Sequence, residues 1–445
     1  MDLSAIMEGH PGKTGADYKL PPITGGDSAS DNTKADVPMF RGLEDESSDF
    51  HLYNIAVYGS LNMDIFSYVS RAPQAGETVD GLDSYTAPGG KGANQAAACA
   101  KLSRVEPGSE LSKTWDRPPI ASIRLFGAVG NDEFGRTLTT ALEGVGVDCR
   151  MVGTKEGVGT GTAIIVVEPN GENRIIVNSN ANFKVMAEDF PSLPYPKPDV
   201  IILQLEIPTA TVIHLIQLAK AEHVPVILNP SPVKQLPEAI YNGLDHLLIN
   251  ETECRTLLGH SNPGGQPLDL EEARKAAVMF NDKGAKNVVI TLGSQGAYAR
   301  NISGDQGWVA AETVEHVVDT TGAGDTFTGA YALGVVINKE NFNIVKAVED
   351  GCHAAAQAVK KRGAIPAIPF LSDLSVPFSR FDHGSRETKA GETANSTGLS
   401  AGTLGEVGNS SASMEVELGQ KRENDAQTDS SSPKRQRADE TMEQS

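Results

Sequence analysis

The feature that most constrains the fold is an alternation of short apolar runs with longer helical stretches through the middle of the sequence. The apolar runs are typical of buried strands and lie at Tyr53–Gly59, Ile120–Phe126, Asp199–Leu203, Val224–Leu228, His246–Ile249 and Asn287–Leu292. Between them, the sequence predicts helices at Gly92–Ser103, Glu133–Val145, Thr209–Glu222 and Leu270–Gly284. Strands that alternate with helices form a parallel sheet covered on both faces. We therefore expect an α/β fold.

Two segments, Asp64–Pro88 and Thr160–Val177, interrupt this order. Both alternate apolar and polar residues as half-exposed strands do, and the second contains the turn signal Pro169-Asn170-Gly171. We expect them to form a small second sheet that covers a site as a lid. The stretch Arg104–Pro119 is rich in charge and proline, which predicts a surface insertion.

The composition of both ends of the chain differs from that of the middle. Residues 1–50 and 374–445 are rich in Gly, Ser, Asp and Glu, with apolar residues that occur singly. Such segments cannot bury enough surface to offset the entropy of ordering, so we expect a disordered N-terminal arm, a folded domain at 51–373 and a disordered C-terminal tail.

The charge, the apolar runs and the cysteines of the chain limit the classes of partner and the cellular compartments that are expected. With 38 Lys and Arg against 58 Asp and Glu, the net charge of −20 argues against nucleic acid as the main partner. No apolar run has the length of a membrane span, and the four cysteines form no CxxC pair. A soluble protein of a reducing compartment, cytoplasmic or nuclear, is expected.

One sequence feature specifically indicates a nuclear location. Lys421-Arg422 and Lys434–Arg437 are separated by eleven residues, the spacing of a bipartite nuclear-localisation signal. A basic patch that keeps an acidic tail soluble is the simpler explanation.

The segment Asp319–Ala330 carries the strongest chemical signal. Gly322, Ala323 and Gly324 bring backbone N–H groups to the start of a helix, which attracts anions. Asp325 then lies in the first turn, where a carboxylate can take a proton from an attacking hydroxyl while the N–H groups hold a transferred phosphoryl group. The alternative is that Asp325 only complements the dipole of a glycine-capped helix.

Two further segments suit a hydroxyl-rich ligand. Gly89–Ala98 is a glycine loop that opens a helix, and its Lys91 and Asn94 can donate to hydroxyls or phosphates. It lacks the spacing of a P-loop, and an ordinary glycine-rich helix start is the alternative. In Gly59–Asp64, Asn62 and Asp64 point to the same side of an extended chain and can hold adjacent sugar hydroxyls; a turn is the alternative.

Two segments at the ends of predicted strands suit a nucleotide and its metal ion. Asn250–Glu253 offers an amide and a carboxylate that suit hydrated Mg²⁺, or else an Asn cap with Glu in the first helical turn. Thr291–Gly296 is a glycine turn that lets the backbone approach phosphates, or else a plain hairpin turn.

Together and in this order, these segments resemble the ribokinase family of carbohydrate kinases, from about Tyr53 to Pro369. Gly89–Ala98 and Asp319–Ala330 resemble the two signature patterns of that family. Within it, the segments most similar to the ribose-phosphorylating members are Gly59–Asp64, Gly76–Thr78, Gln204–Glu206 and Asn229–Pro232. The resemblance implies a three-layer αβα sandwich with a small β-sheet lid.

The resemblance also implies an activity, the transfer of the ATP γ-phosphoryl group to O5 of D-ribose. In it Asp325 is the general base, and the backbone of Gly322, Ala323 and Gly324 is the anion hole. The residues implied to hold the sugar are Asn62, Asp64, Gly90, Lys91, Asn94, Glu206 and Asp325. Those implied to hold ATP and Mg²⁺ are Asn250, Glu253, Thr291, Leu292, Gly293, Ser294, Gln295, Gly296 and Gly324.

Members of the family often bind K⁺ beside the anion hole and pair through their lids. The matching cation positions are Asp319, Thr321, Ala358, Lys361 and Gly363. Ala367 departs from the pattern, because a serine hydroxyl often completes the shell there. The resemblance leaves open whether Cys352 or His353 faces the adenine. It implies a homodimer joined through the lid.

Two alternatives remain. Another sugar or nucleoside kinase of the same family shares the catalytic end, although Asn62 with Asp64 argues against an adenosine kinase. A non-catalytic kinase-like regulatory protein is the other, and the joint presence of Asp325, Gly324, Asn250 and Glu253 argues against it.

Overall fold

The computed structural model describes residues 51–115, 117–169, 172–259 and 267–374. The N-terminal arm, the tail from 375 onward, the basic groups at 421–422 and 434–437, and the tip of the Pro169–Gly171 turn lie outside the described residues. One predicted boundary is wrong. Leu374 was expected in the tail, but its side chain is buried in the same apolar cluster as Leu371, so the packed part extends at least to residue 374.

The alternation of strands and helices predicted from the sequence is confirmed, and it forms one large sheet of ten strands. These strands are β1 (Tyr53–Tyr58), β4 (Ala121–Gly130), β5 (Val147–Asp148), β6 (Val152–Lys155), β9 (Val200–Leu203), β10 (Val226–Leu228), β11 (His246–Asn250), β12 (Asn287–Thr291), β13 (Ala297–Asn301) and β14 (Gln306–Val309). Their order is β14-β13-β12-β11-β10-β9-β1-β4-β5, with β6 also paired to β4. Every pair is parallel except those within the β12–β13–β14 meander.

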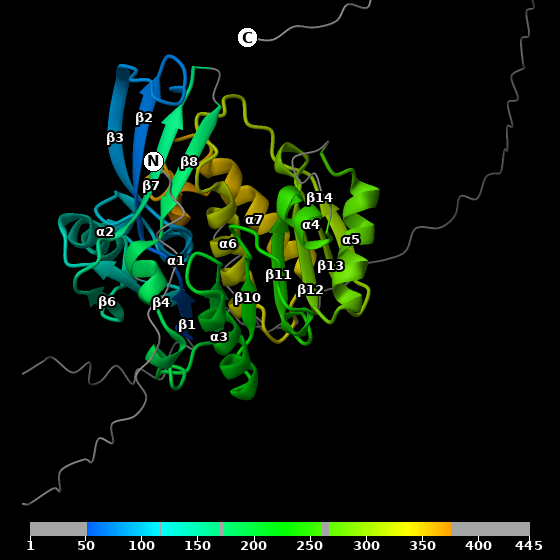
Figure 1. The fold of residues 1–445 in the computed structure, drawn as a ribbon. Coiled ribbons are helices and arrows are strands. Elements are labelled where there is room, and N and C mark those ends of the chain that lie inside the picture. Colours follow the sequence, from blue (N-terminus) through cyan, green and yellow to red (C-terminus); the bar gives the residue numbers. More distant parts are fainter. Residues whose placement is uncertain (1–50, 116, 170–171, 260–266, 375–445) are drawn as a thin grey trace, which may run out of the picture. The chain divides into compact units, whose positions relative to one another are not determined.

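Helices cover both faces of this sheet, as Figure 1 shows. They are α1 (Lys91–Leu102), α2 (Glu133–Gly144), α3 (Thr209–Ala221), α4 (Glu251–Leu257), α5 (Leu270–Asp282), α6 (Ala323–Ile337) and α7 (Ile344–Ala358). Successive residues of a strand point to opposite faces. Accordingly, Ile55 and Val57 of β1 pack in a cluster with residues of α1, α2, α6 and α7, whereas Ala56 and Tyr58 pack with α3, α4 and α5. The fold is the expected three-layer αβα sandwich.

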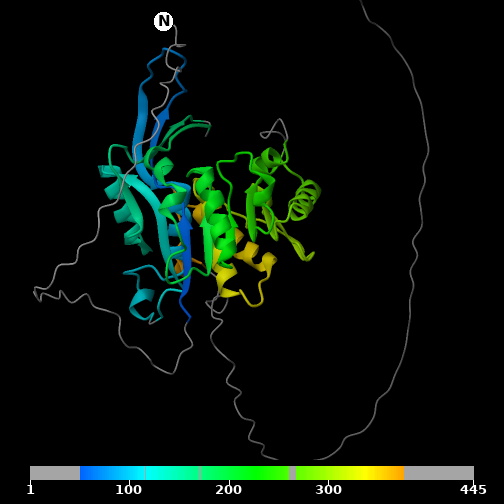
Figure 2. The same cartoon turned by 60° about the horizontal axis from the view of Figure 1, so that its bottom comes forward.

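The two segments that interrupt the alternation form the expected second sheet. Its strands are β2 (Asn62–Val69), β3 (Gly81–Gly89), β7 (Gly161–Val167) and β8 (Asn173–Asn178), in the order β3-β2-β7-β8. Phe66, Ala87, Ala163 and Ile165 form a small apolar cluster of their own within it. This small sheet projects from one end of the sandwich (Figures 1 and 2).

The segment predicted as an insertion, Arg104–Pro119, joins α1 to β4 and contains a 3₁₀ turn at Leu111–Lys113. Apart from Val105, its described side chains are exposed or partly exposed. It therefore lies at the surface and adds no strand to either sheet.

The topology places the candidate site segments along one edge of the large sheet. Strands β1, β9, β10, β11 and β12 are consecutive neighbours and parallel. Their carboxyl ends lead into the segments that begin at Gly59, Gln204, Asn229, Asn250 and Thr291. Ligands of open α/β sheets bind at this edge. Segments far apart in the sequence therefore meet there.

Candidate active site

Asp325 lies in the first turn of α6, next to the predicted anion hole. Gly322 caps the helix with φ of 76°, a backbone conformation that favours glycine, and an ideal Cβ there would lie 3.0 Å from Ala364 Cα. Ala323 N–H already donates to the Thr320 carbonyl at 3.2 Å. The Gly322 and Gly324 N–H groups make no hydrogen bond to a described residue. Two of the three expected donors are therefore free to bind an anion.

Two amides of α1 hold the Asp325 carboxylate. Asn94 Nδ2 donates to Oδ2 and Gln95 Nε2 donates to Oδ1, both at 2.9 Å. The side chain is buried, with 8% of its surface exposed. Burial raises the pKa of Asp325, while Lys91 and the two amide hydrogen bonds oppose the rise. The carboxylate is thus desolvated but supplied with donors on both oxygens.

A buried chain of amides continues from Gln95 to the ends of two strands. Gln204 Nε2, after β9, donates to Gln95 Oε1 at 2.7 Å. Gln95 Nε2 also donates to Asn229 Oδ1 at 3.1 Å, and Asn229 Nδ2 donates to the Leu248 carbonyl at 3.0 Å. We call Gln204, Gln95 and Asn229 the amide chain. These residues lie in segments that resemble the family, but no local pattern assigns them a role, because only the fold brings them together.

The glycine loop before α1 packs directly on the segment after β1. Gly90 has φ of 90°, and an ideal Cβ there would lie 2.6 Å from Asn62 N. Lys91 N–H donates to Glu206 Oε2 at 3.0 Å, and the Ser60 hydroxyl donates to the same oxygen. The loop therefore needs glycine at position 90, and Glu206 holds the loop backbone with one oxygen.

Asn62 and Asp64 lie at the junction of the two sheets. Asn182 Nδ2 donates to Asn62 Oδ1 at 2.8 Å, and the Asn182 side chain also bonds the backbone N–H and C=O of Leu61. Asn182 belongs to a 3₁₀ turn, Asn180–Lys184, and no sequence pattern marks it as a site residue. With its oxygen engaged, Asn62 keeps its Nδ2 donors for a ligand.

Asp64 and Lys91 carry the remaining charges of the site. Burial, together with Glu206 and Asp325, raises the pKa of Asp64 to about 7, and Lys91 opposes this. Burial lowers the pKa of Lys91, but the carboxylates of Asp325, Glu206, Glu253 and Asp64 outweigh it, so its pKa is raised. Lys91 is therefore a protonated ammonium among four carboxyl groups.

The two segments expected to hold the nucleotide are neighbours, since Asn250 and Thr291 are register partners on β11 and β12. Both also have the simpler local structures. Asn250 and Glu253 form a capping box at the start of α4, and residues 293–295 form a 3₁₀ turn in the β12–β13 hairpin. The side chain of Leu292 is buried, so this residue offers only its backbone to a ligand.

The expected cation loop is tied together by Asp319. Its Oδ1 accepts from Thr321 N and Oγ1 at 2.9 and 2.6 Å, and its Oδ2 accepts from Gly363 N at 2.8 Å. Ala358 and Lys361 lie in the adjoining turn, where Lys361 N donates to the Ala358 carbonyl. Donors occupy both oxygens of the Asp319 carboxylate, so backbone carbonyls of this loop are the oxygens that could hold K⁺. Ala367 is buried and offers no hydroxyl.

Within the described ranges, no group of three or more His, Cys, Asp and Glu side chains is arranged to hold a metal ion. Glu253 is buried and its carboxylate offers one oxygen beyond that used in the capping box.

Cys352 and His353 lie on α7 and differ in their contacts. Burial raises the pKa of the Cys352 thiol to about 12. His353 Nδ1 is hydrogen-bonded to Glu312, and its Nε2 is buried without a partner. These contacts do not assign the adenine to either residue.

The site combines a buried carboxylate at a helix N-terminus with a lysine and amides at the carboxyl edge of a parallel sheet. This arrangement is suited to deprotonating a hydroxyl beside a bound anion, which defines a kinase of small hydroxyl-bearing molecules. The chain belongs to the pfkB family of carbohydrate kinases, whose family model matches residues 53–371.

Individual relatives agree with this assignment. The chain is 34% identical over 338 residues to a ribokinase of Schizosaccharomyces pombe, which covers 74% of this chain and 98% of the relative. It is 30% identical to a deoxyribokinase of Salmonella typhi, over 72% of this chain and 97% of the relative. Among solved structures, Arabidopsis thaliana ribokinase complexed with ribose and ATP has a TM-score of 0.61 and 30% identity, covering 73% of this chain and 98% of that one.

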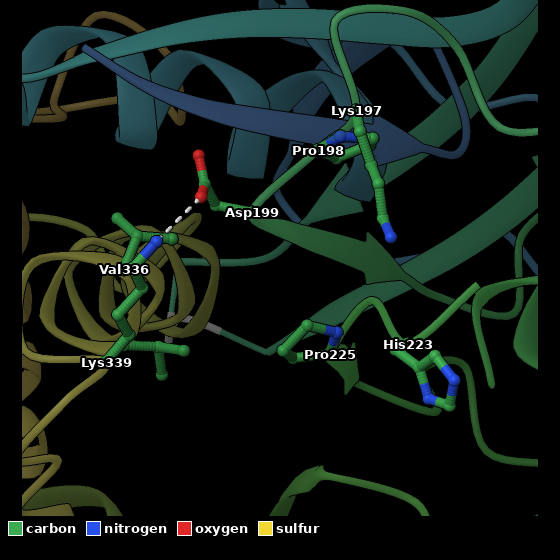
Figure 3. Close-up of a pocket in the computed structure, with 8 residues that line it drawn as sticks. Lys197, Pro198, Asp199, His223, Pro225, Val336 and Lys339 are labelled. Atoms are coloured by element: carbon green, nitrogen blue, oxygen red, sulfur yellow. Dashed lines mark hydrogen bonds and ion pairs between the residues drawn. The ribbon is translucent and has the colours of Figure 1, made fainter. Parts of the chain in front are cut away.

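A separate pocket of about 410 Å³ lies at the far end of α6 (Figure 3). It is lined by Lys197, Pro198, Asp199, His223, Pro225, Val335, Val336 and Lys339. These residues precede β9 and β10 or lie at the end of α6, so the pocket is separated from Asp325 by about 16 Å along the helix and includes none of the predicted site residues. In the described part of the chain, no helix is both long and apolar enough to cross a membrane.

Proposed function

We propose that the protein transfers the γ-phosphoryl group of ATP to the O5 hydroxyl of D-ribose. The relatives support phosphorylation of ribose by ATP at the level of the family. For this chain, the proposal rests on the placement of Asp325 beside Asn94, Lys91 and the N-terminus of α6. Asp325 takes the proton from the attacking hydroxyl, and the free N–H groups of Gly322 and Gly324 stabilise the charge on the phosphoryl group.

The observation that carries the sugar site is an orphaned buried atom. Asn94 Oδ1 is buried and has no hydrogen-bond partner, although Asn94 Nδ2 is bound to Asp325. A buried acceptor without a partner is costly, and a sugar hydroxyl would satisfy it. Such a hydroxyl would lie within reach of the Asp325 carboxylate. This explains why the Asn94 amide on α1 and the Asp325 carboxylate on α6 lie next to each other.

The remaining sugar contacts follow from the groups that the protein leaves available. Asn62 keeps its Nδ2 donors, and neither the Asp64 carboxylate nor the Lys91 ammonium hydrogen-bonds another described residue. Together they offer the Asn62 amide and the Lys91 ammonium as donors, and the Asp64 carboxylate as an acceptor, to adjacent sugar hydroxyls. Glu206 contributes its second oxygen, and the backbone of Gly90 allows close approach.

ATP is proposed to lie along the edge formed by Asn250 and the turn Thr291–Gly296, with its γ-phosphate toward Gly324. Exposed residues of the turn, Gly293 to Gln295, leave the backbone open to the nucleotide. Mg²⁺ bound to the phosphates would neutralise their charge and would meet Glu253 through water. K⁺ held by backbone carbonyls of the Asp319 loop would stabilise the neighbouring anion hole.

The small sheet is proposed to act as a lid and to join two copies of the chain. Leu82, Ile175, Ile176 and Val177 are exposed apolar residues on it. An isolated four-stranded sheet with exposed apolar residues gains stability when a second copy covers them. Closure over the sugar would exclude water, which Asp325 would otherwise activate.

ATP turnover by the purified protein tests the proposal. We expect transfer to D-ribose, faster with K⁺ than with Na⁺ at equal ionic strength, and a much slower ATP hydrolysis without sugar. The acceptor panel should include 2-deoxyribose, fructose and adenosine, because the family contains kinases of several acceptors and one relative is a deoxyribokinase. A clear preference for another acceptor would replace ribose and leave the catalytic proposal intact. No turnover with any acceptor would favour a regulatory protein.

A further inference from the structure

We propose that Gln95 is a positioning residue for the reaction: locked by Gln204 and Asn229, it fixes one oxygen of Asp325 and presents only donors to it. The inference rests on the proposed role of Asp325 as general base. It adds a layer of residues that touch neither sugar nor nucleotide. Both hydrogens of Gln95 Nε2 are already used, one on Asp325 Oδ1 and one on Asn229 Oδ1.

The orientation of every side chain in the amide chain follows from one backbone group, the carbonyl of Leu248. The Leu248 carbonyl can only accept, so Asn229 must turn its Nδ2 toward it and its Oδ1 toward Gln95. Gln95 must then offer Nε2 to Asn229, which leaves its Oε1 for the Nε2 of Gln204. A flipped Gln95 would place oxygen against oxygen at Asn229 and at Asp325. The network therefore fixes which end of Gln95 meets the base.

Burial makes this constraint strong. Gln95 and Gln204 are fully buried, so water cannot replace a lost hydrogen bond easily. Gln204 Oε1 lies against Gly59, where an ideal Cβ would come within 2.0 Å of it, and this oxygen has no partner. The structure thus leaves one amide oxygen unsatisfied while keeping the amide in place. We interpret the unfavourable free energy of this unpaired Gln204 oxygen as a consequence of the orientation in which Gln204 donates to Gln95.

The chemistry explains why Asp325 needs such a residue. Buried beside Glu206, its carboxyl has a raised pKa, and a protonated carboxyl cannot act as a base. Charged groups that bear on Asp325 are Lys91 and Glu206, and Asp64 is close enough for Asp325 to raise its pKa. Lys91 contributes a positive charge near Asp325 but does not fix the orientation of the Asp325 carboxylate. The oxygen of Asn94 is left open to the proposed sugar, whereas the Gln95 amide is fully used within the protein.

Two variants of Gln95 test this role. Gln95→Met keeps a long side chain but removes the donor, and we expect kcat to fall about 10- to 100-fold, as a slightly misplaced base does, with sugar KM changed less than about threefold. Gln95→Glu puts an acceptor against Asp325 and should move the acid limb of the kcat/KM profile upward by about one pH unit or more. Gln204→Met removes the donor to Gln95 Oε1 but leaves the contact of Gln95 with Asn229, so it should hold the Gln95 amide less rigidly and give a smaller loss of kcat.

A control variant separates positioning from stability. Asn281 is also a buried amide, and its Nδ2 donates to the Ala285 carbonyl at 2.8 Å on α5, outside the site. Asn281→Leu should lower the melting temperature while leaving kcat and the pH profile per folded molecule unchanged. If the loss of kcat in Gln95→Met only follows a comparable loss of folded protein, the positioning role is wrong.

A direct readout does not depend on the sugar. In protein labelled with ¹³C at the aspartate carboxyl carbon, the Asp325 resonance is identified by its absence in Asp325→Asn. Its titration midpoint should rise by about one unit or more in Gln95→Met and less in Gln204→Met. An unchanged midpoint, or a kcat of Gln95→Met within about threefold of the parent, would overturn the proposal. If the parent phosphorylates no acceptor, the proposed function fails, and the titration still decides whether Gln95 controls Asp325. Should Gln95→Met not fold, Gln204→Met carries both measurements.

Discussion

Asp325 is the single residue on which the proposed chemistry depends most directly. We expect Asp325→Asn to lower kcat by about 10² to 10⁴, the usual contribution of a general base, because the amide keeps the shape but cannot accept the proton. Binding of sugar and nucleotide, measured by calorimetry, should change little. A variant that keeps most of the parent kcat would show that the carboxylate only complements the dipole of α6.

Asp64 predicts a pH dependence of sugar binding. Because its pKa is raised to about 7, most of its carboxyl is neutral at pH 6 and most is ionised at pH 8. An ionised carboxylate accepts hydroxyl hydrogen bonds more strongly. The sugar KM should therefore fall by up to about tenfold between pH 6 and pH 8, and Asp64→Asn should raise KM and remove this dependence. A KM of the parent that does not vary with pH would contradict the assignment.

The same group predicts a pH dependence of stability. The pKa of Asp64 rises from 3.8 to about 7 on folding, so its contribution to the free energy of unfolding is present at low pH and is lost as the pH rises through 7. Asp64→Asn should thus melt a few degrees above the parent at pH 8 and close to it near pH 4. Asp83→Asn, at an exposed position of the same sheet, is the control and should not change the difference between the two pH values.

At the scale of elements, the four helices predicted from the sequence pattern agree with α1, α2, α3 and α5 to within a residue or two at each end. It also left two alternatives at each strand end, a local structure and a nucleotide site, and the structure contains both local structures. Asn250 is a helix cap and Thr291–Gly296 is a hairpin turn, yet their register pairing puts both at the edge where a nucleotide is expected. A local motif therefore does not reveal a second role, because that role depends on neighbours from other strands.

The small sheet carries the prediction of a dimer. Ile175 pairs with the buried Ile165 across β7 and β8, so its side chain lies on the face that bears Asp64, and 56% of it is exposed. We expect the parent to be a dimer in sedimentation at micromolar concentration and Ile175→Asp to shift it to monomer. Ile302→Asp is the matched control, with a similar exposure of 55% at the end of β13. A parent that sediments as a stable monomer would rule out pairing through the lid.

For the whole molecule, we expect the two ends of the chain to contribute little to catalysis. A chain trimmed to residues 51–374 should keep the parent kcat and melting temperature, because the removed composition builds no core. Further removal of Leu371 to Leu374 should lower the melting temperature, since both leucines pack in the apolar cluster that contains residues of α1 and α7. A large loss of activity in the 51–374 chain would show that an end segment completes the site.

What the sequence determined by itself was the order of strands and helices, the second sheet and the residues that carry reactive groups. These follow from local periodicity and from side-chain chemistry, which each segment expresses on its own. The tertiary structure alone decided which partners those groups meet. Gln204, Gln95 and Asn229 come from three elements, and Asn182 comes from a turn without a motif, so no local pattern links them to Asp325 or Asn62. The state of Asp325 depends on burial and on two donors from α1, which lie 231 and 230 residues before it in the chain, and only packing supplies both.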